Sequence, residues 1–475
     1  MSYFKKLIQP WCPAGTTAVA SAKRRKRPLR RQNSPQPVQT YEQAVHWLES
    51  HYNLEQHLGG KRVEAPSLKR MSTLMELLGN PQHDIPAIHI TGTNGKGSTC
   101  RMLTEIIGAT GLKVGSYSSP HIERVNDRIM IGNEPVDDES FLAAIGEIAD
   151  IEPWVIKATG ETPSYFEVIC AAAYNWFAAS AVDVNVIEVG MGGKWDATNV
   201  IEADVAVITN VGPDHLEIIG PTVAEVAQEK SGIISKRSHV ICGETDPALV
   251  EIISKADQRA TWRRSVEFEL SEDRLAVGGR LIDLRTSFGQ HAELFLPVNG
   301  SHQAENATLA VAAAEAFFGR HLDSEVIQNA FDQLKLPARF EIVSRQPTII
   351  IDGAHNPPAA TVVAETLFND FASEDKPILV IGLNEPREPS AFVQAIGGTH
   401  FSKIIATAAD WPRAIPADQI AAELNDLDSI TEIQPEVSKA LDRALQLAGD
   451  AGTILITGSL YLAAQARAQL ATPPR

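Results

Sequence analysis

The sequence predicts an α/β fold with two domains: an N-terminal domain with a parallel sheet and a small antiparallel meander, then a smaller α/β domain. Short apolar segments of strand length alternate with helical patterns, which is typical of a parallel sheet covered on both faces. Residues 260–300 change to the two-residue alternation of antiparallel strands. A chain of 475 residues exceeds what one hydrophobic core usually organises, so two domains are expected.

The composition is that of a globular protein in water, with 44% hydrophobic and 21% charged residues. No uninterrupted apolar stretch reaches about 18 residues, so no transmembrane helix is expected. The chain has four cysteines, Cys12, Cys100, Cys170 and Cys242. They form no close pair and show no metal-ligand spacing, which favours inert thiols in a reducing, intracellular compartment.

Charge is distributed unevenly between the first 40 residues and the rest. Residues 1–40 hold nine Lys and Arg and no acid, which leaves 33 basic against 59 acidic residues in the remainder. The segment KRRKRPLRR (Lys23 to Arg31) has too little apolar surface to fold alone. Three functions remain open for this segment: an arm that binds nucleic acid or anionic lipid, a transit peptide, or a contact with the acidic body. We favour a disordered extension, or one that arises because the start of the sequence was assigned too early. The acidic body itself argues against nucleic-acid binding.

The folded part is expected to start near Thr40 with two helices. The segments YEQAVHWLESHY (41–52) and SLKRMSTLMELLGN (67–80) have apolar residues at helical spacing. Gly79, Asn80 and Pro81 end the second helix. The β-favouring segment IPAIHI (85–90) follows as the first strand.

A glycine-rich turn follows that strand and opens an apolar helix. Its residues are Gly92, Thr93, Asn94, Gly95, Lys96, Gly97 and Ser98. A strand, a glycine turn and a helix N-terminus together make a phosphate cradle, where backbone N–H groups face the anion and Lys96 reaches the distal phosphates. The spacing departs from the usual GxxxxGK[ST] motif, because Gly97 separates the lysine from the hydroxyl of Ser98. The alternative is a glycine-rich turn with an incidental lysine.

Strands and helices then alternate to about residue 244. The segment VGSYSSPH (114–121) precedes a loop with Arg124, Asn126 and Arg128, which leads into a short strand, RIMIG (128–132). The patterns predict helices over 139–150, 164–180 and 222–235, and strands over 182–190, 204–212 and 238–244. Such alternation favours right-handed crossovers between parallel strands.

The chain changes character twice after that point. Segments 265–279 and 281–298 alternate as antiparallel strands, and 301–318 returns to a helix. Pro337 breaks the preceding helix, so Leu336–Glu341 is a candidate domain junction. Beyond it, strands are predicted over 347–352, 376–383, 401–408 and 452–459, with a helix over 357–371.

Polar residues follow several predicted strands, where parallel sheets bind their ligands. Glu188 ends an apolar strand and is followed by Gly190, Gly192 and Gly193. A carboxylate there could hold Mg²⁺ against phosphates, because that ion prefers oxygen ligands. The alternative is an exposed glutamate at a strand end.

Three further segments carry weaker indications of a functional site. Asp214 and His215 follow the next strand, although a single histidine is more often structural than a ligand. Lys230 lies on a helix, where a solvated lysine is the ordinary interpretation. Asp352, with His355 and Asn356 after it, follows the first strand of the second domain, where an Asx turn is the alternative. Together these residues could converge on one nucleotide.

The motifs resemble those of folylpolyglutamate synthases and dihydrofolate synthases, the folate branch of the ATP-dependent Mur ligases. The matching segments in order are HITGTNGKGST, YSSPHIERVNDRIMI, EVGMGGKWDATN, PDHLEIIGPTVAEVAQEKSGI, SHQAENA, PARFE, DGAHNP and ITGSLYL. The resemblance implies a P-loop ATPase-like domain over 41–336 and a smaller Rossmann-like α/β domain over 337–475. The basic tail, residues 1–40, lies outside it.

The resemblance also implies roles for individual residues. The cradle Gly92 to Ser98 would hold the phosphates of ATP, with Lys96 at the β- and γ-phosphates. Two magnesium ions are implied, bound by Ser119, Glu188, His215 and the carbamylated side chain of Lys230. The nucleotide would also contact Asn306, Arg339 and Asp352, and His355 would lie at the interdomain active site. Phe166 and Glu167 belong to a segment near the pterin pocket, and Arg128 is a further candidate for substrate contact.

The implied activity is ATP-dependent addition of L-glutamate to dihydropteroate, to reduced folates, or to both, through an acyl phosphate. We expect a bifunctional enzyme that acts on these small molecules as a cytoplasmic monomer, without nucleic acid or membrane. The alternatives are a monofunctional folylpolyglutamate synthase and a non-catalytic ATP-binding module. A peptidoglycan-type Mur ligase would need an N-terminal substrate domain that 40 basic residues cannot form.

Overall fold

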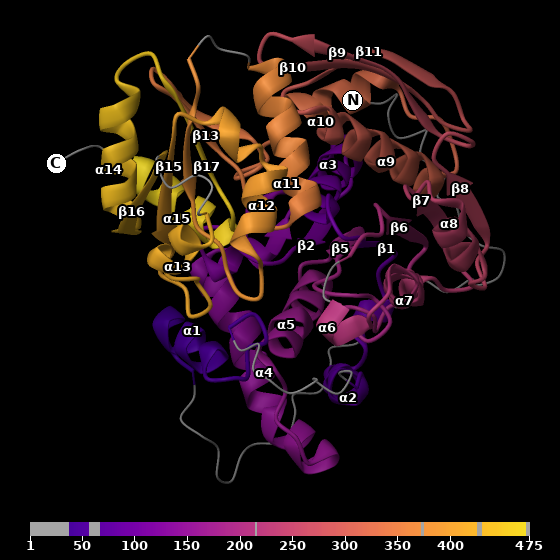
Figure 1. Ribbon diagram of the computed structural model, residues 1–475. Coiled ribbons are helices and arrows are strands. Elements are labelled where there is room, and N and C mark those ends of the chain that lie inside the picture. The colour runs from indigo at the N-terminus through magenta and orange to yellow at the C-terminus, as the bar shows by residue number, and fades with distance from the viewer. Residues whose placement is uncertain (1–37, 57–66, 214–215, 372–374, 425–429, 472–475) are drawn as a thin grey trace. The chain divides into compact units, whose positions relative to one another are not determined.

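The computed structural model describes residues 38–56, 67–213, 216–371, 375–424 and 430–471. The basic tail, Cys12 and His215 therefore lie outside the described residues. Two large sheets and one small sheet organise the described chain (Figure 1). Both large sheets belong to one compact unit, which begins at Val38.

The first large sheet has eight strands, and six of them are parallel. Two short antiparallel strands extend one edge. From edge to edge the strands are β4 (Glu134–Pro135), β3 (Ile129–Ile131), β2 (Val114–Tyr117), β5 (Val184–Glu188), β1 (Ala87–Thr91), β6 (Val205–Ile208), β7 (His239–Cys242) and β8 (Ala260–Arg263). The predicted parallel sheet is confirmed, but the expectation of antiparallel structure from residue 260 is wrong for β8, which pairs with β7 in parallel.

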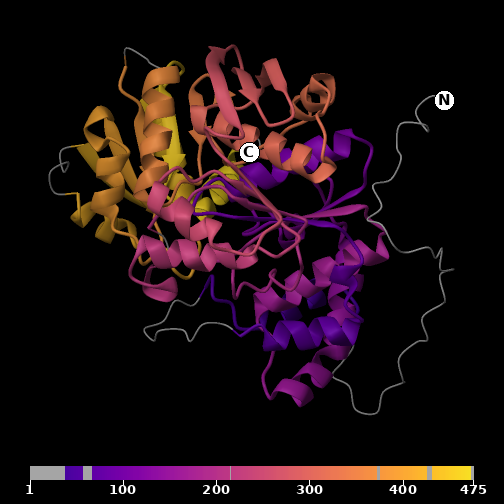
Figure 2. The same cartoon turned by 90° about the vertical axis from the view of Figure 1, so that its right-hand side faces the viewer.

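Helices cover both faces of this sheet, which explains why its central strands are mostly apolar. One face packs against α3 (Lys96–Ala109) and α9 (Ser301–Phe318). The other packs against α1 (Tyr41–Glu49), α2 (Lys69–Leu78), α4 (Asp138–Thr159) and α5 (Tyr165–Ala179). Helices α6 (Leu216–Ile219), α7 (Val223–Lys230) and α8 (Pro247–Ser254) pack beside β6 and β7. In Figure 2 the cluster of α1, α2, α4 and α5 lies below the sheet.

Helix α4 is longer than the predicted 139–150. Asp137 caps its start by accepting a hydrogen bond from the Ser140 N–H at 2.7 Å, and Gly160 ends it in the left-handed conformation. The helix continues through Pro153, and Val155 beyond it is buried in the same cluster as Ile148. Burial of that further turn therefore outweighs the hydrogen bond that a proline removes.

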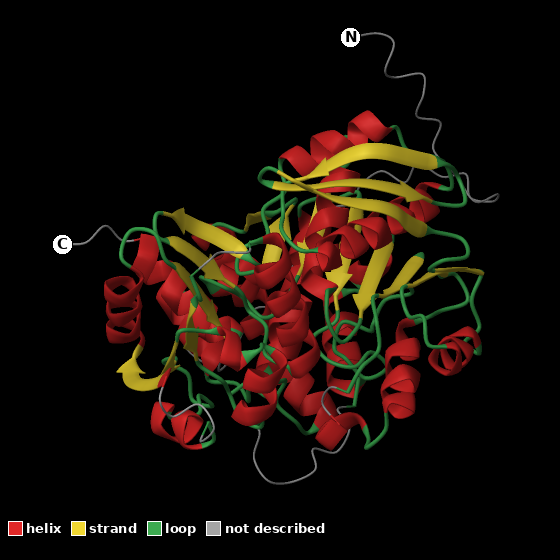
Figure 3. Ribbon diagram, turned by 45° about the horizontal axis from the view of Figure 1, so that its top comes forward, coloured by secondary structure: helices red, strands yellow, loops and turns green. Residues whose placement is uncertain are grey.

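The predicted meander is a three-stranded antiparallel sheet of β9 (Glu269–Ala276), β10 (Gly279–Arg285) and β11 (Gln290–Leu296). It packs on α9 and α10 (Ser324–Asp332), and both helices pack on α3. Figure 3 shows its three strands lying over those helices. The small sheet thus supports the helix that follows the glycine-rich turn.

The second large sheet has six strands, and five of them are parallel. Its strands in order are β12 (Glu341–Arg345), β13 (Thr348–Ile351), β17 (Thr453–Thr457), β14 (Ile378–Ile381), β15 (Lys403–Ala408) and β16 (Thr431–Glu436). Helices α11 (Pro357–Glu365), α12 (Pro389–Ala395) and α13 (Ala417–Ala422) cover one face, and α14 (Val437–Ala448) and α15 (Leu460–Ala471) cover the other. The edge strands β12 and β16 were not predicted from the sequence, because their side chains are mostly half-buried or exposed.

Short helical turns complete the description. They are η2 (Pro81–His83), η3 (Val125–Arg128), η4 (Ser231–Ile233), the π-helical turn η5 (Thr366–Asp370) and η6 (Gly398–His400). Within the described ranges, no helix combines the length and apolar character needed to cross a membrane.

Candidate active site

The glycine-rich turn between β1 and α3 has a backbone that only glycine fits at two places. Gly92 has φ 156°, and a Cβ atom there would lie 1.8 Å from the Thr209 hydroxyl oxygen. Gly95 has φ 82°, and its Cβ would lie 2.4 Å from the Asn306 side-chain oxygen. The turn is therefore shaped by close neighbours as well as by left-handed φ angles.

The segment after β6 holds this turn from behind. The Asn94 N–H donates to the Asn210 side-chain oxygen at 3.0 Å, and the Thr209 hydroxyl donates to the Asn94 carbonyl at 2.6 Å. Thr93 exchanges hydrogen bonds with Gly212 through its hydroxyl, at 2.9 and 3.2 Å. Adjacent parallel strands thus end in two loops that fix each other.

Lys96 begins α3 and folds back over the turn. Its Nζ donates to the Gly92 carbonyl at 3.0 Å, which places the ammonium group over the cradle. The next residue, Gly97, faces Glu188: a Cβ at Gly97 would lie 3.4 Å from a Glu188 carboxylate oxygen. The glycine that interrupts the usual motif therefore adjoins the carboxylate at the end of β5.

Glu188 is buried beside the cradle. It is 4% exposed, and its carboxylate accepts a hydrogen bond from the Ser119 N–H at 3.2 Å. Burial raises the pKa of Glu188, whereas Lys96 acts in the opposite direction, as does the Ser119 N–H. The Glu188 carboxylate and Ser119, in the loop after the adjacent strand β2, offer the oxygen ligands that Mg²⁺ prefers.

Lys230 is 3% exposed at the end of α7, not a solvated helical lysine. The glycine-rich loop after β5 packs directly on this helix end: a Cβ at Gly193 would lie 2.8 Å from the Glu229 carbonyl oxygen and 3.0 Å from that of Lys230. The Lys194 N–H donates to Glu229 at 2.9 Å. The structure therefore brings the loop that follows Glu188 against the end of α7.

The second sheet contributes to the same region. Asn356 caps α11 by accepting from the Ala359 N–H at 2.9 Å, and its NH₂ group donates to the Asn94 side chain of the cradle at 3.1 Å. Asp352 is buried and accepts from the N–H groups of Phe340 and Ala354, both at 2.7 Å. Burial raises the pKa of Asp352, and the charge of Arg339 opposes that rise.

One cavity of about 1210 Å³ joins most of these groups, although Gly92 and Lys230 are not among its lining residues. Of the residues proposed from the sequence, it is lined by Thr93, Asn94, Gly95, Lys96, Gly97, Ser98, Ser119, Phe166, Glu167, Glu188, Asn306, Arg339, Asp352 and His355. The ring of Phe166 lies against the backbone after β5, since a Cβ at Gly190 would be 2.5 Å from its Cζ atom. The cavity thus places a phosphate cradle and an aromatic wall in one space, lined from both large sheets.

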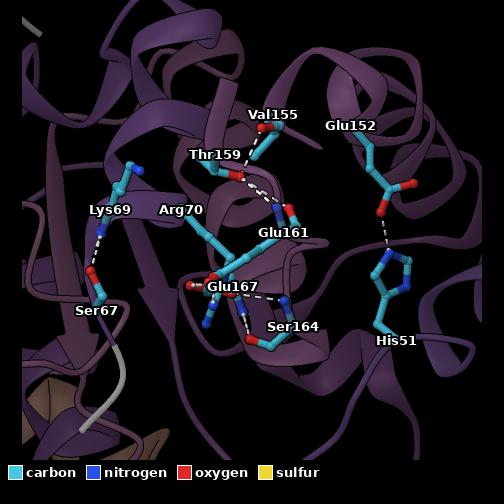
Figure 4. Close-up of polar contacts among 10 residues, drawn as sticks. All are labelled: His51, Ser67, Lys69, Arg70, Glu152, Val155, Thr159, Glu161, Ser164 and Glu167. Atoms are coloured by element: carbon cyan, nitrogen blue, oxygen red, sulfur yellow. Dashed lines mark hydrogen bonds and ion pairs between the residues drawn. The ribbon is translucent and has the colours of Figure 1, made fainter. Parts of the chain in front are cut away.

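A charged group lines another part of this cavity. Arg70 donates to Glu167 from its Nε at 3.0 and 3.2 Å, and its guanidinium also pairs with Glu161 (Figure 4). Glu167 in turn accepts from the Ser164 N–H at 2.7 Å, in a capping box that starts α5. Figure 4 also shows the nearby pair of His51 and Glu152, which ties the end of α1 to α4. Arg70 was not among the residues proposed from the sequence.

Arg128 is fully buried, and its guanidinium donates to Glu55 at 2.7 and 2.8 Å. Its Nε donates to His121 at 3.0 Å. Glu55 lines the cavity, and the backbone of the same residue accepts from Arg413 of the second sheet's domain. The geometry makes Arg128 a support for Glu55, and its contact with substrate stays a prediction.

Sequence reasoning missed the residues that connect separate segments. Thr209 and Asn210 lie near the end of the strand predicted over 204–212, whereas the observed strand β6 ends before them at Ile208, so their position near a strand end was the available signal. Asn356 was named with Asp352 and His355 among the residues that could converge on a nucleotide, but its contact with Asn94 was not predicted. Nothing local marked Arg70 or Glu55, because their partners Glu167 and Arg128 are 97 and 73 residues away in the chain.

Two family descriptions match the chain. The Mur ligase middle domain matches residues 90–314, and the Mur ligase glutamate ligase domain matches residues 338–460. The first range contains the cradle, Glu188 and Lys230. The second begins at the junction beside Arg339 and contains Asp352 and His355.

Curated relatives and solved structures agree. The chain is 34% identical to a dihydrofolate synthase/folylpolyglutamate synthase of Mycobacterium tuberculosis, over 92% of this chain and 96% of that protein. It is 33% identical to a folylpolyglutamate synthase of Lacticaseibacillus casei, over 85% and 94%.

The structure of the Mycobacterium tuberculosis folylpolyglutamate synthase with ADP and AMPPCP superposes with a TM-score of 0.84 at 33% identity, over 92% of this chain and 99% of that one. An Escherichia coli structure with DHPP and ADP gives a TM-score of 0.79 at 27% identity, over 92% and 99%. The resemblance seen in the motifs is thereby confirmed, and the chain belongs to the dihydrofolate synthase/folylpolyglutamate synthase family of Mur ligases.

Proposed function

We propose that this protein is an ATP-dependent ligase that joins L-glutamate to the carboxylate of dihydropteroate and of reduced folates. The observation that carries the proposal is the single cavity that holds the cradle around Lys96, the buried Glu188 and residues of both large sheets. Relatives that share at least 30% of its sequence are named for these two activities. Their solved structures contain ADP, AMPPCP or DHPP.

ATP would bind with its phosphates in the turn from Gly92 to Ser98. The backbone N–H groups of the turn and the start of α3 favour anions, and Lys96 adds a positive charge above them. The rest of the nucleotide would lie against Asn306, Arg339 and Asp352, which line the same cavity. Nucleotide binding would thus use both large sheets.

The residues beside the cradle fit magnesium. Glu188 presents a buried carboxylate, and Ser119 adjoins it through its own N–H. These residues would hold one ion, and His215 with a carbamylated Lys230 would hold a second. When bound, magnesium supplies neutralisation of the charge that develops on the phosphate oxygens.

The chain's own residues would perform the reaction by positioning and by charge. Lys96 stabilises the γ-phosphoryl group as it moves from ATP to the substrate carboxylate, which yields ADP and an acyl phosphate. The amino group of glutamate then attacks the acyl carbon and loses a proton, and phosphate leaves as the amide forms. His355 lines the cavity from the second sheet, where it can orient the incoming groups.

The acyl phosphate must be kept from water, so the site is expected to close around it. The junction at Leu336–Glu341, which we place between domains 41–336 and 337–475, provides a hinge for that motion. Residues Ala338 and Phe340 on either side of Arg339 have φ angles of 55° and 47°, a conformation that non-glycine residues adopt only when held there. Closure would therefore act directly on an arginine that lines the cavity.

The deciding experiment offers the purified protein ATP and glutamate with one pterin substrate at a time. Dihydropteroate should give a product heavier by one glutamate residue, and a reduced folate should give an extended glutamate tail, both read by mass spectrometry. Product from the folate alone would identify a monofunctional folylpolyglutamate synthase. ATP binding without ADP release in either mixture would reject ligase activity. We also propose that the protein is a cytoplasmic monomer. Size-exclusion chromatography with light scattering tests whether it is monomeric.

A further inference from the structure

Two histidines and a glutamate gather at the junction of the small sheet with α9 and α10. His291 is on β11, Glu315 is near the end of α9, and His321 is in the connection to α10. Their ligand atoms all lie within 4.8 Å of one another. None of these three residues is among the described residues that line the active-site cavity.

The hydrogen bonds of Glu315 are crowded at one oxygen. Its Oε1 lies 3.2 Å from His291 Nε2, 2.8 Å from His321 Nδ1 and 2.8 Å from the Leu322 N–H. The other oxygen, Oε2, accepts from the Thr286 hydroxyl. A carboxylate oxygen has two lone-pair directions, so the three nitrogen atoms around Oε1 cannot all make well-directed hydrogen bonds with it.

Burial makes this crowding more significant. The side chains of Glu315 and His291 are 0% exposed, and buried carboxylates are usually paired with cations or bound to metals. A cation shared by Oε1 and the two ring nitrogens would leave the Leu322 N–H as the single hydrogen-bond donor at that oxygen. Such an ion would satisfy all three groups at once.

The surroundings hold the two rings, which stack with centroids 4.5 Å apart and planes 17° apart, so a shared ion requires the partly exposed His321 ring to turn. His291 Nδ1 lies 2.8 Å from the Ser324 hydroxyl, which can hold the tautomer whose Nε2 is free to bind a metal. The ring of His321 lies against Gly289, where a Cβ would be 2.7 Å from Nδ1. The His321 side chain is 41% exposed, so solvent and ions can reach the group.

We propose that His291, Glu315 and His321 form a binding site for a divalent transition-metal ion of the zinc type, separate from the ligase site. Two imidazole nitrogens and one carboxylate make a ligand set that zinc uses, with a fourth position open to water. The nitrogen ligands disfavour magnesium and calcium, which prefer oxygen. The bound ion would join β11 to the end of α9 and to the start of α10, and so would stiffen the support of α3.

Zinc binding to the full chain tests the site without reference to ligase activity. The protein is treated with EDTA, desalted and titrated with zinc alone against a chromophoric chelator. The wild type should bind one more tight ion than His321→Gln, whose partly exposed position favours normal folding. We expect His321→Gln to lower the affinity of this site for zinc by about 100-fold or more, and Ser324→Ala to lower it by roughly 10-fold.

The exposed His83 supplies the matched control, and His83→Gln should leave zinc binding unchanged. Cobalt should produce the visible absorption of a tetrahedral site in the wild type and in this control, but not in His321→Gln. Zinc should also raise the Tm of the wild type by more than it raises the Tm of His321→Gln. Equal stoichiometry and equal Tm shifts in wild type and His321→Gln would overturn the proposal, since the three residues would then be held by hydrogen bonds alone.

Discussion

The shape of the cradle depends on single atoms behind it. Gly92 and Gly95 each face a polar side chain from another element, Thr209 and Asn306, at distances that leave no room for a methyl group. Gly97 is different, since a Cβ there would reach Glu188 only at 3.4 Å, an ordinary contact. The first two glycines are therefore required by the fold of the turn, whereas Gly97 keeps the space beside the carboxylate open.

We predict that Gly92→Ala destabilises the protein and removes ligase activity. The new methyl group would collide with Thr209, and the backbone would be strained, for a combined effect of about 3 kcal/mol. Gly108→Ala in α3, the helix that follows the turn, is the control, because no atom outside the nearby backbone of that helix lies within 4 Å of the added Cβ. That change should stabilise α3 by up to about 1 kcal/mol. Urea unfolding of both variants measures the difference, and equal stabilities would contradict this account of the turn.

At the same scale, Lys96→Ala should leave the fold intact and lower kcat/KM by roughly 100- to 1,000-fold. Its Nζ is partly buried and bonded only within its own turn in the described contacts, to the carbonyls of Gly92 and Thr93. Removing it therefore takes positive charge from the phosphates and from the nearby Glu188, but it breaks no hydrogen bond to another segment among the described contacts. Circular dichroism and steady-state kinetics would be compared with those of Lys439→Ala, which changes an exposed side chain on α14. Wild-type-like ligation by a folded Lys96→Ala protein would reject the assignment of the phosphate loop.

At the scale of elements, the central strands were predictable because their local pattern matches their burial. Strands β1, β5 and β6 are buried at every residue, so each is mostly apolar even though β1 contains His89 and β5 contains Asn185. The edge strands β12 and β16 lack this pattern, since they bury few of their side chains and are held by backbone pairing. These strands form because the neighbouring strand offers backbone hydrogen bonds, and their own sequences carry no strong strand pattern.

The candidate site divides in the same way. Glu188 and Asp352 could be found because both end buried strands, and parallel strands bring such ends to one edge of a sheet. Which side chains meet across sheets could not be found from the pattern alone. The contact between Asn94 and Asn356 joins positions 262 residues apart. Contacts of that kind depend on how the two sheets pack.

His121, which contacts the Arg128 that supports Glu55, leads to a prediction about how the stability of the fold depends on pH. Burial, with the adjacent charge of Arg128, lowers the pKa of His121 from 6.5 to about 4. Between these values the unfolded chain binds a proton that the folded chain does not. Lowering the pH from 6.5 towards 4 should therefore destabilise the fold by up to about 1.4 kcal/mol per pH unit.

His121→Gln should lose this part of the pH dependence, because the amide oxygen can still accept from Arg128 but does not titrate in this range. The free energy of unfolding of both proteins would be measured in urea at several pH values from 4 to 7. The gap between the two curves should change across this range and level off above pH 6.5. Parallel curves throughout would show that His121 titrates normally.

Across the whole molecule, the second large sheet and its helices are connected to the earlier part of the chain at several points. Asn356 reaches the cradle, Arg413 reaches the Glu55 backbone, and Arg280 of the small sheet pairs with Asp370 of η5 at 2.6 Å. The Arg280 pair is largely buried, with side-chain exposures of 8% and 15%. Each of these contacts joins residues before 336 to residues after 341, so each spans the proposed junction and would affect how tightly the site closes.

Asn356 allows closure to be separated from local stability. Its Oδ1 caps α11, and its NH₂ group makes the contact with Asn94. Asn356→Asp keeps a good capping oxygen but replaces the donor with a second oxygen, so the contact is lost. The free energy of unfolding should change by less than about 0.5 kcal/mol, whereas Asn356→Ala should lose about 1 kcal/mol of capping energy.

If the contact helps to close the site, Asn356→Asp will expose the acyl phosphate to water. More ADP should then be released per amide bond formed than the ratio of one expected for tight coupling, and Asn94→Ala should raise the ratio similarly because it removes the other partner. Coupled assays for ADP and mass spectrometry of the amide product give the two quantities. A ratio of one in both variants, with unchanged kcat/KM, would mean that closure does not depend on this contact and must rest on the Arg280 and Arg413 connections instead.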